Sequence, residues 1–84
     1  QEHVDFLAGI KIKGFDYKGL VNNVTGVIYQ DFNINCRSMN FESTEGIFEG
    51  TIMLYIQNVE HLQKLIEKLK TIEGIKKVER INSY

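Results

Sequence analysis

The spacing of apolar residues changes abruptly between Gly14 and Gly19, and this change constrains the fold more than any other feature of the chain. Before it, isoleucine and lysine alternate over residues 10–13, which is the period of a β-strand. After it, apolar residues recur at helical spacing, at Leu20, Val24, Val27 and Ile28. The sequence therefore predicts a strand over Phe6–Lys13, a turn, and a helix from Gly19 to about Tyr29.

Two further strands are predicted in the middle of the chain. Asn33–Phe41 forms the first, and Ile47–Ile56, where apolar residues alternate, forms the second. The polar segment Ser43–Gly46 between them ends in glycine, as hairpin loops of this length prefer. Alternation directs four apolar side chains of the second strand toward the core: Phe48, Ile52, Leu54 and Ile56.

A second helix and a last strand complete the pattern. Asn58 is a preferred N-cap residue for a helix over Val59–Lys70, and Ile75–Ile81 follows as a partly charged strand. The resulting order is strand, helix, strand, strand, helix, strand. With right-handed crossovers it predicts an α+β fold, a ferredoxin-like βαββαβ sandwich with two helices on one face of a four-stranded antiparallel sheet.

Size and composition exclude several classes of protein. The 84 residues form a single small domain, residues 1–84 with a core over about 6–82. The 10 basic and 11 acidic residues give a net charge of −1, which argues against a dedicated nucleic-acid binder. A single cysteine excludes an internal disulfide, and no apolar run approaches the ~18 residues that span a membrane. Because the chain begins with Gln1, we expect a domain cut from a longer protein, and the single cysteine fits a reducing cytoplasm.

Neither a metal site nor a catalytic centre is predicted. His3 and His61 lie far apart, and no ligand cluster accompanies them. Cys36 has no base near it in the sequence, so we expect a small buried hydrophobe. Gly26, inside the first helix, costs about 1 kcal/mol relative to alanine, so we expect close packing to require it. We expect no cofactor.

The turn Gly14–Asn23 is the best candidate for a binding site. Backbone N–H groups at a helix start can hold an anion or the carboxylate of an amino acid. Asp16 can pair with an ammonium group, or it can cap the helix, since aspartate is a preferred capping residue. The sequence leaves both interpretations of Asp16 open.

The face of the sheet opposite the helices is a second candidate. Straight alternation places six side chains there: Leu7, Arg37, Met39, Phe41, Met53 and Tyr55. Large exposed apolar patches usually mark a partner, and we expect a homodimer first and the rest of the parent protein second. Residues 46–55 are loosely similar to a strand of RNA-recognition motifs. Sequence-specific base stacking is not expected, because alternation points Phe48 into the core.

Two groups of residues resemble a known family. Asp16–Val24, followed by Asn33–Asn35, resembles the small-molecule-sensing ACT domain. Phe48–Ile52, His61–Lys70 and Ile75–Arg80 resemble, more closely, the C-terminal ACT domain of RelA/SpoT-type (p)ppGpp synthetase/hydrolases. The resemblance covers nearly the whole chain. It implies a regulatory, non-catalytic module that follows the catalytic domains of a GTP pyrophosphokinase, a (p)ppGpp hydrolase, or an enzyme with both activities.

The resemblance also implies roles for single residues. Asp16 matches a ligand-contacting polar residue, Gly19 the glycine that opens the helix, and Asn33 an asparagine supplied across a dimer. The chain departs from the family pattern at Lys18, where proline is common, and at Gly14, where serine-binding members have histidine. The expected ligand-binding residues are Asp16, Tyr17, Lys18, Gly19, Leu20, Asn22, Asn23, Asn33 and Asn35. The expected dimer or partner surface comprises Met39, Phe41, Met53 and Tyr55.

Three functions remain open at this point. The domain senses an amino acid, dimerises and controls the catalytic domains of a stringent-response enzyme. Alternatively, it contacts the ribosome or tRNA within the parent protein, through a basic edge at Lys76, Lys77 and Arg80. In the third alternative it is a purely structural dimerisation element.

Overall fold

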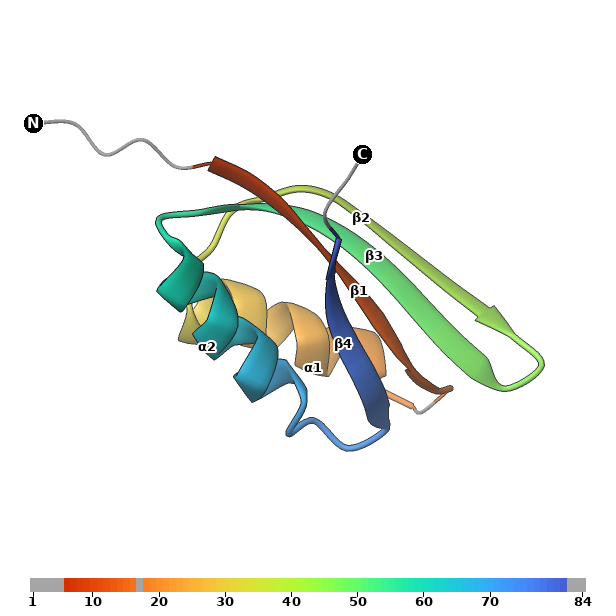
Figure 1. Ribbon diagram of the computed structural model, residues 1–84. Helices are drawn as coiled ribbons and strands as arrows, with labels where there is room; N and C mark the ends of the chain where they lie inside the picture. Colours follow the sequence, from red (N-terminus) through yellow and green to blue (C-terminus); the bar gives the residue numbers. More distant parts are fainter. Residues whose placement is uncertain (1–5, 17, 82–84) are drawn as a thin grey trace, which may run out of the picture.

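The computed structural model describes residues 6–16 and 18–81. The elements are β1 (Phe6–Phe15), α1 (Leu20–Gly26), the π-helical segment η1 (Val27–Asp31), β2 (Cys36–Thr44), β3 (Ile47–Ile56), α2 (Val59–Leu69) and β4 (Ile75–Ile81). The strands form one antiparallel sheet in the order β2-β3-β1-β4. Both helices lie on the same face of this sheet (Figure 1). The predicted ferredoxin-like sandwich is confirmed.

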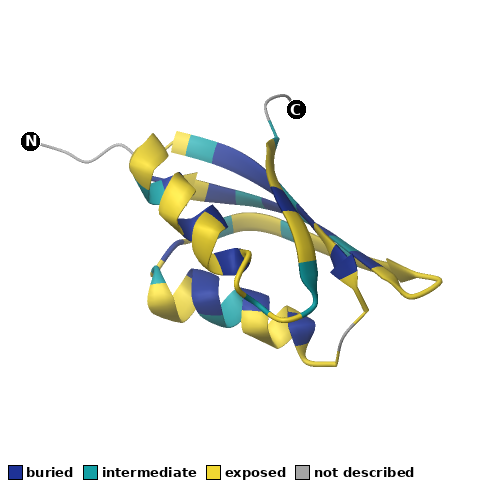
Figure 2. Ribbon diagram, turned by 60° about the horizontal axis from the view of Figure 1, so that its bottom comes forward, coloured by how far each residue is buried: buried dark blue, intermediate teal, exposed yellow. Residues whose placement is uncertain are grey.

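The core lies between the sheet and the helices because each element has an apolar side of the right period. Even-numbered residues of β1 and β3 point toward the helices, and Ile10, Ile12 and Ile52 are fully buried. The helix α2 adds a stripe at spacings of three and four, namely Leu62, Leu65, Ile66 and Leu69. Figure 2 shows this separation of buried and exposed residues on both layers. Asn58 caps α2 as predicted, since its Oδ1 accepts from the His61 N–H at 2.8 Å.

A β-bulge changes which residues of β2 face the helices. Cys36 pairs with Leu54, but Ser38 pairs with Met53, so Arg37 is an extra residue in the strand. The bulge moves every later residue of β2 to the opposite face from the one that straight alternation predicts. Met39 now pairs with the buried Ile52.

Met39 and Phe41 are therefore not on the open face, and their predicted place there is wrong. Both pack against the core, and the Phe41 ring stacks on the buried Phe48 ring with centroids 5.6 Å apart. Gly50 makes room for this ring, because a Cβ there would lie 2.8 Å from Cδ1 of Phe41.

β2 lies three residues later than the predicted Asn33–Phe41, whereas β3 has its predicted bounds, so the turn of the hairpin is tighter than predicted. Thr44 pairs with Ile47, which leaves a turn of two residues, Glu45 and Gly46, with φ values of 53° and 80°. Positive φ at both central positions is the geometry of a type I′ turn, which matches the twist of hairpin strands. The hairpin extends past the ends of both helices (Figure 1). Its register is fixed at one end by this turn and at the other by the bulge.

Gly26 does not pack closely, so the expectation that packing requires glycine there is wrong. Its φ of −61° and ψ of −43° are ordinary helical values. A Cβ built at Gly26 would meet no atom within 4 Å. The glycine instead faces open space at the junction of α1 and η1.

Candidate functional site

Asp16 is attached to the β2–β3 hairpin and does not cap α1. Its backbone N–H donates to the Gly46 carbonyl at 2.9 Å, and its Oδ2 accepts from the Ser43 hydroxyl at 2.6 Å. The N-cap of α1 is Gly19, whose φ is 82°, and this cap makes no side-chain hydrogen bond to the first turn. The capping interpretation of Asp16 is therefore wrong. The uncapped first turn leaves backbone N–H groups available to an anion.

A hollow of about 300 Å³ opens at this turn. It is lined by Asp16, Lys18, Gly19, Leu20, Val21, Asn22 and Phe48. The hollow combines one carboxylate, one ammonium group and an apolar wall in which Leu20 and Phe48 are buried. Five of the predicted ligand-binding residues thus lie together, while Tyr17 lies outside the described residues.

Sequence reasoning missed Val21, Ser43 and Phe48 as parts of this site. Ser43 is 27 residues from Asp16, and nothing in the local sequence pattern signals their hydrogen bond. Phe48 was predicted only as a core residue, and it is one. Its ring also forms part of the wall of the hollow.

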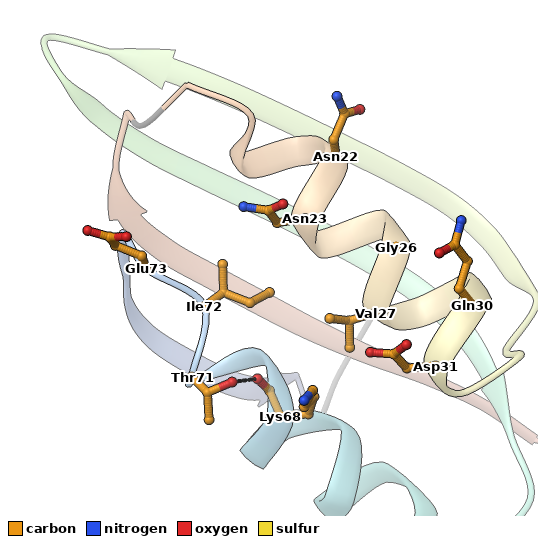
Figure 3. Close-up of a pocket in the computed structure, with 10 residues that line it drawn as sticks. All are labelled: Asn22, Asn23, Gly26, Val27, Gln30, Asp31, Lys68, Thr71, Ile72 and Glu73. Carbon is orange, nitrogen blue, oxygen red and sulfur yellow. Dashed lines mark hydrogen bonds between the residues drawn. The ribbon is translucent and has the colours of Figure 1, made fainter.

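Asn23 lies away from the hollow, in a groove of about 460 Å³ between α1–η1 and the end of α2. Figure 3 shows this groove, with Val27 and Ile72 between the two helical walls. Asn22 lines both the groove and the hollow, and Gly26 lies along the wall formed by α1. The polar side chains of the groove are exposed, and Thr71 donates to the Lys68 carbonyl at 2.6 Å.

Asn33 and Asn35 lie at the opposite end of the sheet from Asp16. The Asn35 carbonyl accepts from the Tyr55 N–H near the end of β3, whereas Asp16 bonds to Gly46, just before β3 begins. Eight strand residues at about 3.4 Å each separate these ends by roughly 27 Å. One copy of the chain therefore does not bring these asparagines to the hollow.

The open face of the sheet is apolar at both ends and charged between them. Met53 and Tyr55 point to this face as predicted, and Tyr55 is 38% exposed. Further along the face, Lys13 pairs with Glu49 at 3.5 Å and Lys77 with Glu79 at 2.9 Å. The exposed pair Phe15 and Ile47 lies beyond these ion pairs. Hydrogen bonding to Lys77 lowers the pKa of Glu79.

The basic residues of β4 do not gather on one face. Lys77 pairs across from Lys13 on the open face, whereas Arg80 pairs with Ile10 on the side of the helices. Lys76 lies over the ring of Phe15, with Nζ 5.4 Å from its centroid. This arrangement gives the RNA-contact hypothesis no added support.

Cys36 is half-buried against the core, close to the predicted environment. Burial raises the pKa of its thiol, although a hydrogen bond from Tyr29 partly offsets this effect. Within residues 6–16 and 18–81, no group of three or more His, Cys, Asp or Glu side chains is placed to hold a metal ion. Over the same residues, no helix is long and apolar enough to cross a membrane.

The comparison with protein families agrees with this geometry. A family model described as "ACT domain" matches residues 2–80. The chain belongs to the ACT domain family. Assignment to this family agrees with the βαββαβ order of the elements.

Two relatives indicate which kind of ACT domain this chain is similar to. The ACT domain from a GTP pyrophosphokinase of Chlorobium tepidum is 40% identical, has a TM-score of 0.85, and covers 93% of this chain and 100% of its own. A guanosine-3′,5′-bis(diphosphate) 3′-pyrophosphohydrolase of Aquifex aeolicus is 30% identical over 77 residues. That match covers 90% of this chain but 11% of the hydrolase. The predicted resemblance to RelA/SpoT-type ACT domains is confirmed.

The same fold recurs in a more distant protein. A homoserine dehydrogenase from Thiobacillus denitrificans aligns over 95% of this chain with a TM-score of 0.74 and 17% identity. The match covers 18% of that enzyme. At this identity the likeness establishes the fold alone.

Proposed function

We propose that this chain is a ligand-sensing regulatory domain of a (p)ppGpp-synthesising or (p)ppGpp-hydrolysing enzyme, without catalytic residues of its own. The observation that carries the proposal is the hollow at the β1–α1 turn, which presents opposite charges beside an apolar wall. This combination suits a free amino acid with an aliphatic side chain. The domain would act by population shift, since a ligand that prefers one arrangement of the domain biases the attached catalytic domains.

Each part of such a ligand has a partner in the hollow. The Asp16 carboxylate pairs with the α-ammonium group, while Lys18 and the uncapped first turn of α1 attract the α-carboxylate. The aliphatic side chain lies against Leu20 and Phe48. An open site of this kind binds weakly, so we expect dissociation constants in the millimolar range, which corresponds to about −4 kcal/mol.

The test is an NMR titration of the ¹⁵N-labelled chain with L-valine and L-isoleucine. We expect the largest amide shifts at residues 14–22 and 48, which form or adjoin the hollow, and their loss in Asp16→Asn. Asp31→Asn is the matched control, because Asp31 is also exposed but lines the other groove. Absence of shifts at millimolar ligand, or shifts that Asp16→Asn leaves unchanged, would refute amino-acid binding in this hollow.

We also propose that the partner of the domain is a second copy of the chain. Met53 and Tyr55 give the open face an apolar end, and Asn33 and Asn35 reach a hollow only if another copy supplies it. Tyr55→Asp should convert the dimer to monomer in sedimentation experiments. Thr51→Asp is the control, because Thr51 lies on the same face beside Lys11. A wild-type chain that sediments as a monomer at high concentration would rule out this partner.

A further inference from the structure

The end of β1 and the residue after it, Asp16, are hydrogen-bonded to two other turns of the molecule. The Phe15 N–H donates to the Gly74 carbonyl at 2.9 Å, in the turn before β4. One residue later, Asp16 is bonded through its N–H to Gly46 and through its Oδ2 to the Ser43 hydroxyl. A length of 2.6 Å is typical of a hydroxyl that donates to an ionised carboxylate, a bond stronger than one between neutral groups.

This bond restricts the Asp16 carboxylate at the mouth of the hollow. A free aspartate side chain on an exposed loop samples several rotamers, and a ligand that needs one of them must order the side chain on binding. The hydrogen bond from Ser43 restricts the Asp16 side chain before a ligand binds. The hydroxyl is neutral, so the carboxylate keeps its full charge for a cationic group.

One cross-strand pair of the hairpin contributes both to the hollow and to the hydrogen bond with Asp16. Ser43 and Phe48 are directly opposite each other in the β2–β3 ladder. Ser43 holds the carboxylate, Phe48 forms part of the apolar wall, and Phe41 stacks on Phe48. An occupant of the hollow therefore contacts the loop and the hairpin together.

We propose that Ser43 is a positioning residue for the ligand's ammonium group, and that its bond to Asp16 couples occupation of the hollow to the order of the β2–β3 hairpin. The inference rests on the proposed function of the hollow. Coupling of this kind is reciprocal: if the Asp16–Ser43 bond favours ligand binding, the ligand favours that bond to the same extent. The hairpin, which extends past the helices, is then the part of the molecule that reports the bound state (Figure 1).

The first arm of the test needs no ligand. Hydrogen exchange of the Asp16 amide, which is bonded to Gly46, is measured in the wild type and in Ser43→Ala, Ser43→Thr and Ser38→Ala. Ser43→Ala should speed this exchange about fivefold, as expected for the loss of one exposed hydrogen bond. Ser43→Thr keeps the hydroxyl and should restore protection. Ser38→Ala, the same change on the open face of β2, should have no effect.

The second arm adds L-valine. The ligand should slow exchange of the Asp16 amide and of the amides of residues 42–47 in the wild type, and affinity should fall about fivefold in Ser43→Ala alone. Equal affinity in the wild type and Ser43→Ala would overturn the proposal, as would unchanged exchange in the ligand-free variant. If L-valine does not bind the wild type, the proposed function fails. The ligand-free arm still decides whether Ser43 orders the loop.

Discussion

Replacing Gly26 with alanine should stabilise the domain, contrary to the usual effect of a mutation inside a folded helix. Gly26 has helical φ and ψ angles, so alanine adopts its conformation without strain. The new Cβ would meet no atom within 4 Å, so no packing is disturbed. Alanine is favoured over glycine in a helix interior by 0.8–1.0 kcal/mol, and we expect a gain of about 1 kcal/mol.

The measurement is urea unfolding followed by circular dichroism, together with the thermal midpoint. A gain of about 1 kcal/mol should raise the melting temperature by roughly 4–8 °C in a domain of this size. Gly14→Ala is the matched control, because its Cβ would collide with the carbonyl oxygen of Gly74, an atom held by the Phe15 N–H. That variant should lose about 1–3 kcal/mol. A Gly26→Ala variant no more stable than the wild type would refute the reasoning.

Three other perturbations test separate parts of the structure. Asn58→Ala removes the cap of α2 and should lower the free energy of unfolding in urea by about 1 kcal/mol, with an unchanged m-value. An unaltered urea midpoint would show that this cap does not stabilise the domain. Because burial raises the pKa of Cys36, iodoacetamide should alkylate this thiol more slowly at mildly alkaline pH in the folded chain than in urea. Tyr29→Phe, which removes the bond that lowers this pKa, should slow the reaction further, and an unchanged rate would exclude the bond. Phe41→Ala should lower the free energy of unfolding by roughly 2 kcal/mol, because the half-buried ring packs on the core. An unchanged free energy of unfolding would indicate that Phe41 lies on the open face.

The raised pKa of Cys36 also predicts the sign of one pH effect on stability. The folded chain keeps its thiol proton at pH values where the unfolded chain loses it. This group therefore contributes fully below the unfolded pKa, near 9.0, and its contribution falls as the pH rises through the folded value. Cys36→Ala should remove this part of the alkaline decline in the free energy of unfolding.

The order of the elements could be predicted because each element has a clear apolar period. The prediction failed where a single extra residue, or a hydrogen bond between residues far apart in the chain, determines the structure. Arg37 adds a single residue to β2, which reverses the facing of Met39 and Phe41 without changing any local propensity. The role of Asp16 stayed open in the sequence, because its bond to Ser43 forms only when the hairpin folds beside the turn. Five residues of the hollow were found because they lie close together in the chain, between Asp16 and Asn22.

The strand order β2-β3-β1-β4 has a consequence for how the protein is made. The first strand, β1, lies between β3 and β4, so one edge of β1, over Gly9–Gly14, pairs only with β4. During synthesis on the ribosome, Ile10 and Ile12 leave the exit tunnel long before their partners Arg80 and Val78 exist. Cooperative folding should therefore wait until β4 is released. Translation arrest in the turn before β4 should leave a chain that proteases degrade readily.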